Sequence, residues 1–280
     1  RKLVLQSASG QKPYDGEDFV LPEYEIITGE LIEGHRISDI KFTLKEIVGA
    51  TDAGIVGRWE NIIVDGSVVI VDANEVNMTE NYDVQCVNGI LEVLLRKLSV
   101  SSNSETKLYD KKPLRGTELT IDPISDMNDG LLEGHSIVYS LPVSAINAGI
   151  YDNEIHELDI LDERGESVKQ YYEVTQNIGK LEILPIEITV TTASKSKTYD
   201  GSPLVYLSYT SDYLEKLLEG HSASIEAIGT ITDAGSIPNA VEIKIFDENG
   251  EDITAIGNYK IIENYGTLTV VPRVIRVVPF

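Results

Sequence analysis

Apolar and polar residues alternate over short stretches of this chain, which predicts β-strands. In the run 241–245, Val241, Ile243 and Ile245 share one face, and charged residues stand between them. We expect this strand to end at Asp247, because the sequence Asp-Glu-Asn-Gly that begins there is typical of a turn.

Helical periodicity is rare. The best candidate is the stretch 212–218 (DYLEKLL), which offers two turns at most. The corresponding stretches at 29–32 and 130–132 are shorter still. We therefore predict an all-β protein.

A second recurring pattern predicts a β-hairpin. Residues 259–263 (YKIIE) form a half-buried run, 264–266 (NYG) a turn, and 267–270 (TLTV) a returning strand. Gly266 is expected to supply a positive φ in this turn. Earlier in the chain Asn88-Gly89, the strongest short hairpin signal, stands at the same place.

The chain repeats itself. The opening RKLVL returns as RKLSV, and IEITV and RVIRV occupy the same place further on. A period of this size indicates tandem domains rather than one large enzyme core. We predict repeats at 1–95, 96–185 and 186–272, and the start of a truncated fourth repeat at 273–280. We expect the chain to be a segment of a longer array.

Each repeat is predicted to be a small β-domain of six or so strands. An Ig-like sandwich is the first interpretation. A β-grasp-like arrangement is the alternative if the Leu-Leu-Glu-Gly-His segment is a genuine helix. The repeats follow one another without a Gly/Ser linker, and Pro185 and Pro272 keep two of the junctions extended. We therefore expect an elongated, semi-rigid rod.

Four landmarks recur in the same order in every copy. They are a Tyr-Asp pair, a Gly-His pair, an Ala-Gly turn, and a Tyr followed seven residues later by Gly. Their residues are Tyr14, Asp15, Gly34, His35, Gly54, Tyr82 and Gly89 in the first copy; Tyr109, Asp110, Gly134, His135, Gly149, Tyr172 and Gly179 in the second; and Tyr199, Asp200, Gly220, His221, Gly235, Tyr259 and Gly266 in the third.

The charge and composition of the chain argue against several classes of binding partner and site. The net charge of −23, from 46 acidic and 23 basic residues, argues against nucleic acid and against an anionic membrane surface. One cysteine, Cys86, provides neither a disulfide framework nor a cysteine-based zinc site. No stretch approaches the roughly 20 apolar residues of a membrane-spanning helix.

The landmarks allow a functional and a structural interpretation. A histidine at a fixed repeat position could bind a metal or sense pH, but each copy supplies one, so a turn histidine bonded to backbone is expected. A Tyr-Asp pair could form a glycan platform, but its recurrence favours a buried ring beside an Asp that accepts turn amides.

No catalytic or cofactor site is expected. Residues 247–252 (DENGED) are rich in oxygen ligands, as sites for a structural Ca²⁺ are, but they lack EF-hand spacing and a solvated turn is expected instead. Asp72 and Asp162 hold the corresponding places. Cys86 lacks a neighbouring motif that would activate it. Phosphate-loop and serine- or zinc-hydrolase motifs do not occur.

With these landmarks the copies resemble the MBG or YDG-type repeats of bacterial surface proteins. That pattern has a Lys-x-Tyr-Asp-Gly start, a Leu-x-Glu-Gly-His middle and an Asn-Tyr-x-Ile…Gly-x-Leu-x-Val end, and the resemblance covers almost the whole chain. The second copy departs from it, with Asp-Lys-Lys-Pro at 110–113 and Gln-Tyr-Tyr at 170–172.

The resemblance implies a stalk of a large cell-wall adhesin, mainly of Gram-positive gut bacteria. We therefore expect a non-catalytic spacer on the outside of the bacterial cell, whose partners are the neighbouring repeats, with no membrane insertion. The alternative is a module that itself binds mucin or another host glycoprotein, as the family name suggests.

Overall fold

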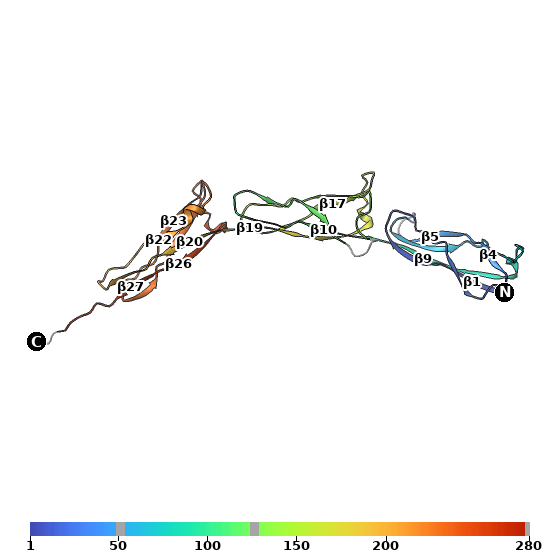
Figure 1. The fold of residues 1–280 in the computed structure, drawn as a ribbon, viewed down its shortest axis with the longest axis horizontal. Helices are drawn as coiled ribbons and strands as arrows, with labels where there is room; N and C mark the ends of the chain where they lie inside the picture. The colour runs from blue at the N-terminus through green and yellow to red at the C-terminus, as the bar shows by residue number, and fades with distance from the viewer. Residues whose placement is uncertain (49–53, 124–128, 278–280) are drawn as a thin grey trace. The chain divides into compact units, whose positions relative to one another are not determined.

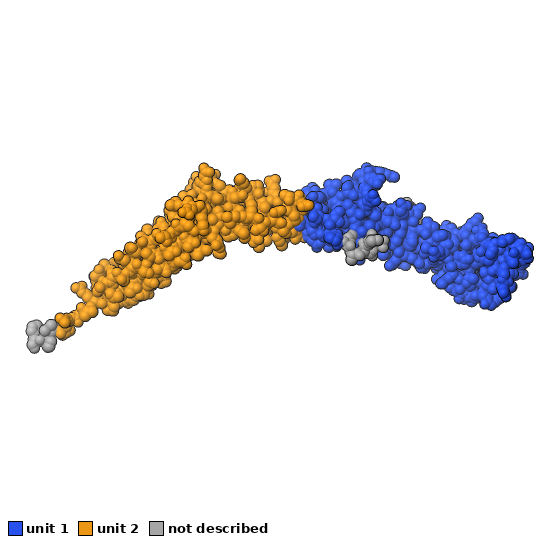
Figure 2. Space-filling view, viewed as in Figure 1, with its two compact units in different colours: residues 1–102, 119–140, 155–177 blue, residues 103–118, 141–154, 178–280 orange. Residues whose placement is uncertain are grey.

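A computed structural model describes residues 1–48, 54–123 and 129–277. They belong to two compact units (Figure 2). Unit 1 contains residues 1–102, 119–140 and 155–177, and unit 2 contains residues 103–118, 141–154 and 178–280. The division runs through the second copy, so the unit boundaries differ from the expected repeat boundaries. The division into three domains stays a prediction.

The protein is all-β, as the alternating pattern predicts. In the described part of the chain the α-helix is one turn, α1 (Tyr213–Lys216), within the stretch 212–218. The corresponding stretches at 29–32 and 130–132 are not helical. The condition for the β-grasp alternative is therefore not met there, and the Ig-like arrangement stays a prediction. The described residues also contain three 3₁₀ turns: η1 (Thr79–Asn81), η2 (Lys169–Tyr171) and η3 (Thr254–Ile256).

Unit 1 contains all the described strands of the first copy and part of the second (Figure 1). Its strands are β1 (Lys2–Ser7), β2 (Gly10–Pro13), β3 (Tyr24–Thr28), β4 (Arg36–Asp39), β5 (Phe42–Val48), β6 (Gly57–Ile63), β7 (Val69–Val71), β8 (Asp83–Val87), β9 (Gly89–Leu94), β10 (Arg96–Ser102), β13 (Leu119–Ile121), β14 (Ser136–Ser140), β17 (His156–Leu161) and β18 (Tyr172–Asn177).

The sheets of unit 1 combine parallel and antiparallel pairs. Strand β1 is central in the order β3-β1-β8 and runs parallel to β8. A second sheet has the order β2-β9-β6-β5, in which β2 and β9 are parallel. The order β13-β10-β18 repeats the first arrangement, with β10 parallel to β18. Strands β4 with β7, and β14 with β17, form two-stranded sheets.

Unit 2 contains the rest of the second copy and the third. Its strands are β11 (Glu105–Leu108), β12 (Leu114–Arg115), β15 (Ser144–Ala145), β16 (Gly149–Asn153), β19 (Gly179–Leu184), β20 (Ile186–Thr192), β21 (Lys195–Thr198), β22 (Tyr209–Ser211), β23 (Ser222–Ala227), β24 (Gly235–Pro238), β25 (Val241–Phe246), β26 (Tyr259–Asn264) and β27 (Thr267–Val271).

Several strand pairings of unit 2 repeat those of unit 1. The sheet orders are β22-β20-β26, β21-β27-β24 and β11-β19-β16, with two-stranded sheets β23-β25 and β12-β15. Strand β20 is parallel to β26, β21 to β27 and β11 to β19. Strand β25 shows the predicted alternation, with Val241, Ile243 and Ile245 buried.

The predicted hairpin is wrong. Strand β26 pairs with β20, whereas β27 pairs with β21 and β24, so the chain changes sheets at residues 264–266. Strands β8 and β9 separate in the same way at Asn88-Gly89, and β18 and β19 do so before Gly179. Because a strand ends wherever the chain changes sheets, each copy contains more and shorter strands than the six or so expected.

The landmark glycine at this point is required by close packing. Neither Gly89 nor Gly266 has a positive φ. A Cβ atom at Gly89 would lie 2.3 Å from the carbonyl oxygen of Ala8, and one at Gly266 would lie 2.6 Å from that of Ala193. Here the glycine lets two backbone segments approach at the change of sheet.

Each unit has its own apolar core. In unit 1 the strands of the first copy bury a cluster that consists of Leu3, Leu5, Ile63, Val68, Ile70 and Tyr82. In unit 2 one cluster runs from the second copy into the third without interruption; it consists of Tyr109, Ala145, Ile183, Ile186, Ile188, Val190, Val241, Ile243, Ile245, Ile253 and Tyr259. Within unit 2, residues of the second copy and of the third copy therefore pack into one apolar core.

Candidate functional site

The Gly-His landmark is a tight turn in every copy. Gly34, Gly134 and Gly220 have φ values of +83°, +82° and +85°, the left-handed region that glycine adopts without a steric penalty. The backbone N–H of the following histidine donates to the carbonyl three residues earlier, at 2.8–3.1 Å. The turn was predicted; the position of the histidine ring was not.

Each histidine ring bonds to the landmark tyrosine of its own copy rather than to backbone. The distances from Nδ1 to the tyrosine hydroxyl are 2.9 Å for His35 and Tyr82, 2.7 Å for His135 and Tyr172, and 2.8 Å for His221 and Tyr259. The partners are 37–47 residues apart in sequence.

The hydrogen bonds of the tyrosine hydroxyl favour one tautomer of the histidine. The Tyr259 hydroxyl oxygen accepts the backbone N–H of Leu218 at 3.1 Å, so its own proton is free for His221 Nδ1. A neutral ring with its proton on Nε2 suits this arrangement. Burial lowers the pKa of His221 and of His135, which favours the neutral form in both.

Successive copies meet at junctions that we call joints: the first around Leu95 in unit 1, the second around Pro185 in unit 2. At each of them a single residue separates the last strand of one copy from the first strand of the next. Landmark residues pack at both joints: Tyr14 at the first and Tyr109 at the second.

At the first joint Tyr14 of the first copy packs against the second copy. Its ring is stacked on Tyr171 with 4.7 Å between centroids and stands edge-on to Tyr172 at 6.2 Å and tilted to His135 at 6.5 Å. Tyr14 is only 6% exposed, and burial raises its pKa. The Arg96 guanidinium donates to the Tyr14 carbonyl at 3.3 Å.

Arg96 is a buried cation whose partners are backbone carbonyls. Besides Tyr14, it donates through Nε to Gly130 at 2.6 Å and through Nη2 to Asp129 at 2.9 Å. Its five donors in a planar fork suit this role. The sequence places Arg96 only as the first residue of a repeat, and nothing in the pattern signals its contacts.

At the second joint Tyr109 takes the place of Tyr14. It is 6% exposed and stands edge-on to Tyr259 at 5.8 Å. Next to it the Asn258 side chain, 2% exposed, accepts the backbone N–H of Ala148 at 2.7 Å and donates to Asn147 Oδ1 at 3.0 Å.

Landmark residues thus lie on both sides of a joint. On the copy before it, the tyrosine of the Tyr-Asp landmark packs at both joints, and Ala148 bonds at the second. On the copy after it, the partners include the landmark tyrosines Tyr172 and Tyr259. In the first copy Asp52 and Ala53 of the Ala-Gly landmark lie outside the described residues, and a Cβ atom at Gly54 would lie 3.2 Å from Asp18 Oδ1. Gly149 and Gly235 begin strands β16 and β24.

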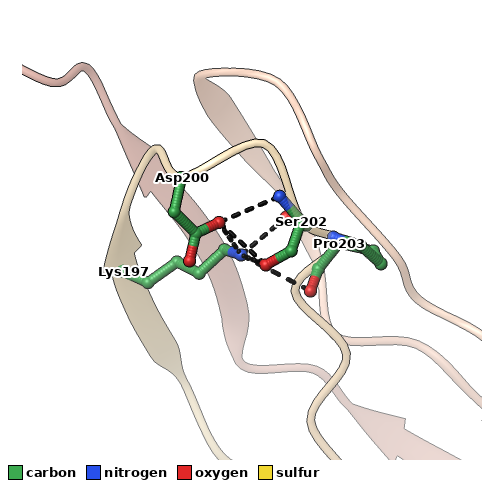
Figure 3. Close-up of polar contacts among 4 residues, drawn as sticks. All are labelled: Lys197, Asp200, Ser202 and Pro203. Atoms are coloured by element: carbon green, nitrogen blue, oxygen red, sulfur yellow. Dashed lines mark hydrogen bonds and ion pairs between the residues drawn. The ribbon is translucent and has the colours of Figure 1, made fainter.

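The Tyr-Asp landmark is held by a lysine three residues before the aspartate. In the third copy Lys197 Nζ lies 2.8 Å from Asp200 Oδ1 and donates to the Ser202 carbonyl at 2.6 Å (Figure 3). Asp200 Oδ1 also accepts the Ser202 N–H at 2.9 Å, so the carboxylate does satisfy a turn amide. The Lys197 bond holds the pKa of Asp200 well below its usual range.

The same turn occurs in the other copies, where Lys12 pairs with Asp15 and Lys107 with Asp110. The second copy lacks the glycine of this turn, and Lys111 adopts the left-handed φ of +64° in its place. Lys111 Nζ donates to the Glu219 carbonyl of the third copy at 2.8 Å. The departure of the second copy from the pattern thus adds a contact across the second joint.

The acidic turn at Asp247 is organised by its own backbone. Asp247 Oδ1 accepts the N–H groups of Asn249 and Glu251 at 2.9 and 2.8 Å, and the Glu251 bond lowers its pKa. Asp72 and Asp162 accept equivalent pairs of amides. Within the described residues no group of three or more His, Cys, Asp or Glu side chains could hold a metal ion.

Cys86 is half-buried at the edge of the first-copy core. Burial raises the pKa of its thiol, which is the opposite of what a cysteine nucleophile needs.

A groove of about 1060 Å³ flanks the second joint in unit 2. Leu108, Leu184 and Leu218 contribute apolar surface, and Lys216 and Lys260 stand beside them. Both lysines bond to Glu187, through its carbonyl at 2.8 Å and its carboxylate at 2.7 Å respectively.

Each copy contains a buried asparagine that the sequence pattern did not predict. Asn61, Asn153 and Asn239 are 0–1% exposed, and each donates to a carbonyl where its copy passes from the first strand to the second: Ala8, Asn103 and Ala193. The available signal is an Asn at a nearly constant distance before the landmark glycine.

Comparison with known proteins does not assign the chain to a family. The chain matches none of the protein-family models against which it was scanned, and the search of curated proteins found no match to it. In the described part of the chain no helix has the length and apolar character needed to cross a membrane.

Proposed function

We propose that this chain is a non-catalytic, extracellular repeat segment that serves as a semi-rigid stalk of a bacterial surface adhesin. The observation that carries the proposal is the burial of Tyr14 and Tyr109 between successive copies. Residues that recur in every copy are used to hold one copy against the next. A spacer needs this property, because its task is to keep its copies in a fixed arrangement.

The single-residue junctions support the same proposal. Leu95 and Pro185 alone separate the strands of adjoining copies, which leaves little freedom for bending. At the second joint the apolar core continues through the junction. The resemblance to MBG or YDG-type repeats, together with the acidic charge, supports the cell-surface location that we propose.

The stiffness of the first joint is measurable within unit 1. Spin labels on cysteines at Asp39 and Glu163, in a Cys86→Ser background, report the distance between the two copies by pulsed electron resonance. We expect a narrow distribution that Tyr14→Ala broadens. Tyr24→Ala is the control, since Tyr24 is also a tyrosine but is 37% exposed. A wild-type distribution as broad as that of Tyr14→Ala would reject the spacer proposal.

The second candidate is a module that binds host glycans, which the groove beside the second joint favours. Its apolar surface, with the side chains of Lys216, Lys260 and Glu187 beside it, suits the ring face and hydroxyl groups of a neutral sugar. A glycan array would show saturable binding that Lys260→Ala weakens and Lys244→Ala, an exposed lysine away from the groove, does not. Absence of saturable binding would reject this candidate.

A further inference from the structure

The second joint places an ionisable histidine beside the contacts that hold the joint. His221 Nδ1 lies 2.8 Å from the Tyr259 hydroxyl, and the Tyr259 ring stands edge-on to Tyr109 of the second copy, with 5.8 Å between centroids. Tyr109 and Tyr259 are each 6% exposed. A hydrogen bond therefore connects a histidine of the third copy to the pair of rings that packs the two copies together.

A lysine of the second copy reaches the same turn of the third. Lys111 Nζ donates to the Glu219 carbonyl at 2.8 Å and lies 3.8 Å from Glu248 Oε2. The positive charge of Lys111 acts on His221 from across the joint, whereas Asp247 and Glu248 act on it from within the third copy. The charge of His221 is therefore coupled to a contact between the copies.

Protonation of His221 changes both contacts. In the neutral ring Nδ1 accepts the hydroxyl proton of Tyr259, whose oxygen accepts the Leu218 N–H at 3.1 Å. A protonated ring carries a proton on Nδ1 and cannot accept, so the Tyr259 hydroxyl proton must turn away from it. The new positive charge also repels Lys111 and attracts Glu248, the carboxylate that pairs with that lysine.

We propose that the second joint is a pH-sensitive hinge, which is closed while His221 is neutral and opens when His221 is protonated. Burial and the charge of Lys111 lower the pKa of His221 in the closed joint, and opening takes Lys111 away from the ring. The open joint therefore binds a proton more readily, so a falling pH favours it. One proton shifts the ratio of closed to open joints by at most about tenfold per pH unit.

Other groups at the joint keep their charge over the range from about pH 7.5 to about pH 5, which brackets the ordinary histidine pKa of about 6.5. Burial raises the pKa of Tyr109 and of Tyr259, so both rings stay neutral. The Glu251 amide lowers the pKa of Asp247, which stays ionised. The amide of Asn258, which bonds across the joint, does not titrate.

Spin labels on the two sides of the joint measure its opening. Thr106 in the second copy and Glu226 in the third are exposed, and cysteines there, in a Cys86→Ser background, report the distance between the copies by pulsed electron resonance. We expect a narrow distribution at about pH 7.5 and a broader one at about pH 5. In His221→Gln, whose amide accepts the tyrosine proton but does not titrate, the distribution should be the same at both pH values.

Two controls separate opening of the joint from other effects of acid. His35→Gln removes the equivalent ring of the first copy and should leave the response of the second joint intact. Labels at Glu226 and Thr267, both in the third copy, should keep one distance at both pH values, because that copy stays folded.

Three results would overturn the proposal. They are a joint distribution that does not change with pH, a change that persists in His221→Gln, and a broadening of the control pair together with the joint pair. The spacer proposal depends on the width of the distribution at neutral pH, and the hinge proposal depends on its change with pH, so each can fail without the other.

Discussion

At the scale of single residues, the landmark tyrosines show how neighbours decide the contribution of a side chain. Tyr14, Tyr109 and Tyr199 occupy one repeat position in similar Lys-Asp turns. The first two are covered by the following copy, and the third is exposed to solvent. Their contributions to stability should differ accordingly.

Replacing a covered tyrosine should therefore cost more than replacing the exposed one. We expect Tyr14→Ala and Tyr109→Ala each to lower the free energy of unfolding by about 2–4 kcal/mol, because a buried aromatic ring and its stacking are lost. Tyr199→Ala should change it by less than about 0.5 kcal/mol. Thermal unfolding of the three variants checks this; equal losses at all three positions would contradict it.

The histidine–tyrosine pairs predict a dependence of stability on pH. The pKa of His135 and of His221 is lower in the folded chain than in the unfolded chain, so the unfolded state binds protons first as the pH falls below about 6.5. The stability from the two neutral rings is thus complete above that pH and is lost as the pH falls towards the folded pKa.

We expect the melting temperature to fall between pH 7.5 and pH 5, a range chosen around the usual histidine pKa of about 6.5. The charged neighbours are Arg96, Asp162 and Glu163 at His135, and Lys111, Asp247 and Glu248 at His221. Asp162 and Asp247 have lowered pKa values and stay ionised in this range. The double variant His135→Gln/His221→Gln should show a flatter profile; an unchanged slope would exclude these histidines as its source.

The landmark residues could be found from the sequence, but their contacts could not. Repetition singles out Gly134, His135 and Tyr172 as important. The bond between His135 and Tyr172 joins residues 37 positions apart, and the packing of Tyr14 on Tyr171 joins two copies. Periodicity describes neighbours along one strand or helix and carries no information about such distant pairs.

At the scale of elements, the strand pairing at the end of each copy could not be predicted from the pattern of apolar and polar residues. A half-buried run, an Asn and Gly turn and a second run describe a hairpin and a change of sheet equally well. Here a change of sheet is favoured because β26 pairs in parallel with β20, whereas β27 pairs in parallel with β21. That information lies some 70 residues away, as the Thr267–Ser194 bond illustrates.

Two glycine substitutions distinguish close packing from turn conformation. Gly250 has a φ of +78° and open space around it, so Gly250→Ala should cost about 1–2 kcal/mol of backbone strain. Gly266→Ala should cost more, about 3 kcal/mol, since its Cβ would lie 2.5 Å from the carbonyl carbon of Ala193 and force the strands apart. Denaturant unfolding measures both; a smaller loss for Gly266→Ala would show that the crossing is loosely packed.

At the scale of the whole molecule, the all-β class follows from the short alternating runs and the near absence of helical periodicity. The joints could not be derived from composition, because they depend on which face of one copy meets which face of the next. The net charge of −23 has a consequence of its own: like charges repel in the folded chain more than in the expanded unfolded chain.

Raising the salt concentration should therefore stabilise the protein. From about 0.01 M to about 1 M the Debye length falls from about 30 Å to about 3 Å, which screens this repulsion. The ion pairs of the described residues are largely exposed, and screening them loses little, about 0–1 kcal/mol for each pair. Calorimetry should show a rising melting temperature; a falling one would mean that the ion pairs outweigh the repulsion.

The parallel pairing of strands at the two ends of a copy determines how it would respond to a mechanical force. In the first copy β1 runs parallel to β8, and β2 runs parallel to β9, the last strand. Tension that pulls the start of β1 one way and the end of β9 the other way acts along these strands, so their hydrogen bonds are loaded in shear. Bonds loaded in shear must break together, whereas bonds that are unzipped break one at a time. The same pairings recur in the later copies, so each copy would resist extension up to an abrupt rupture.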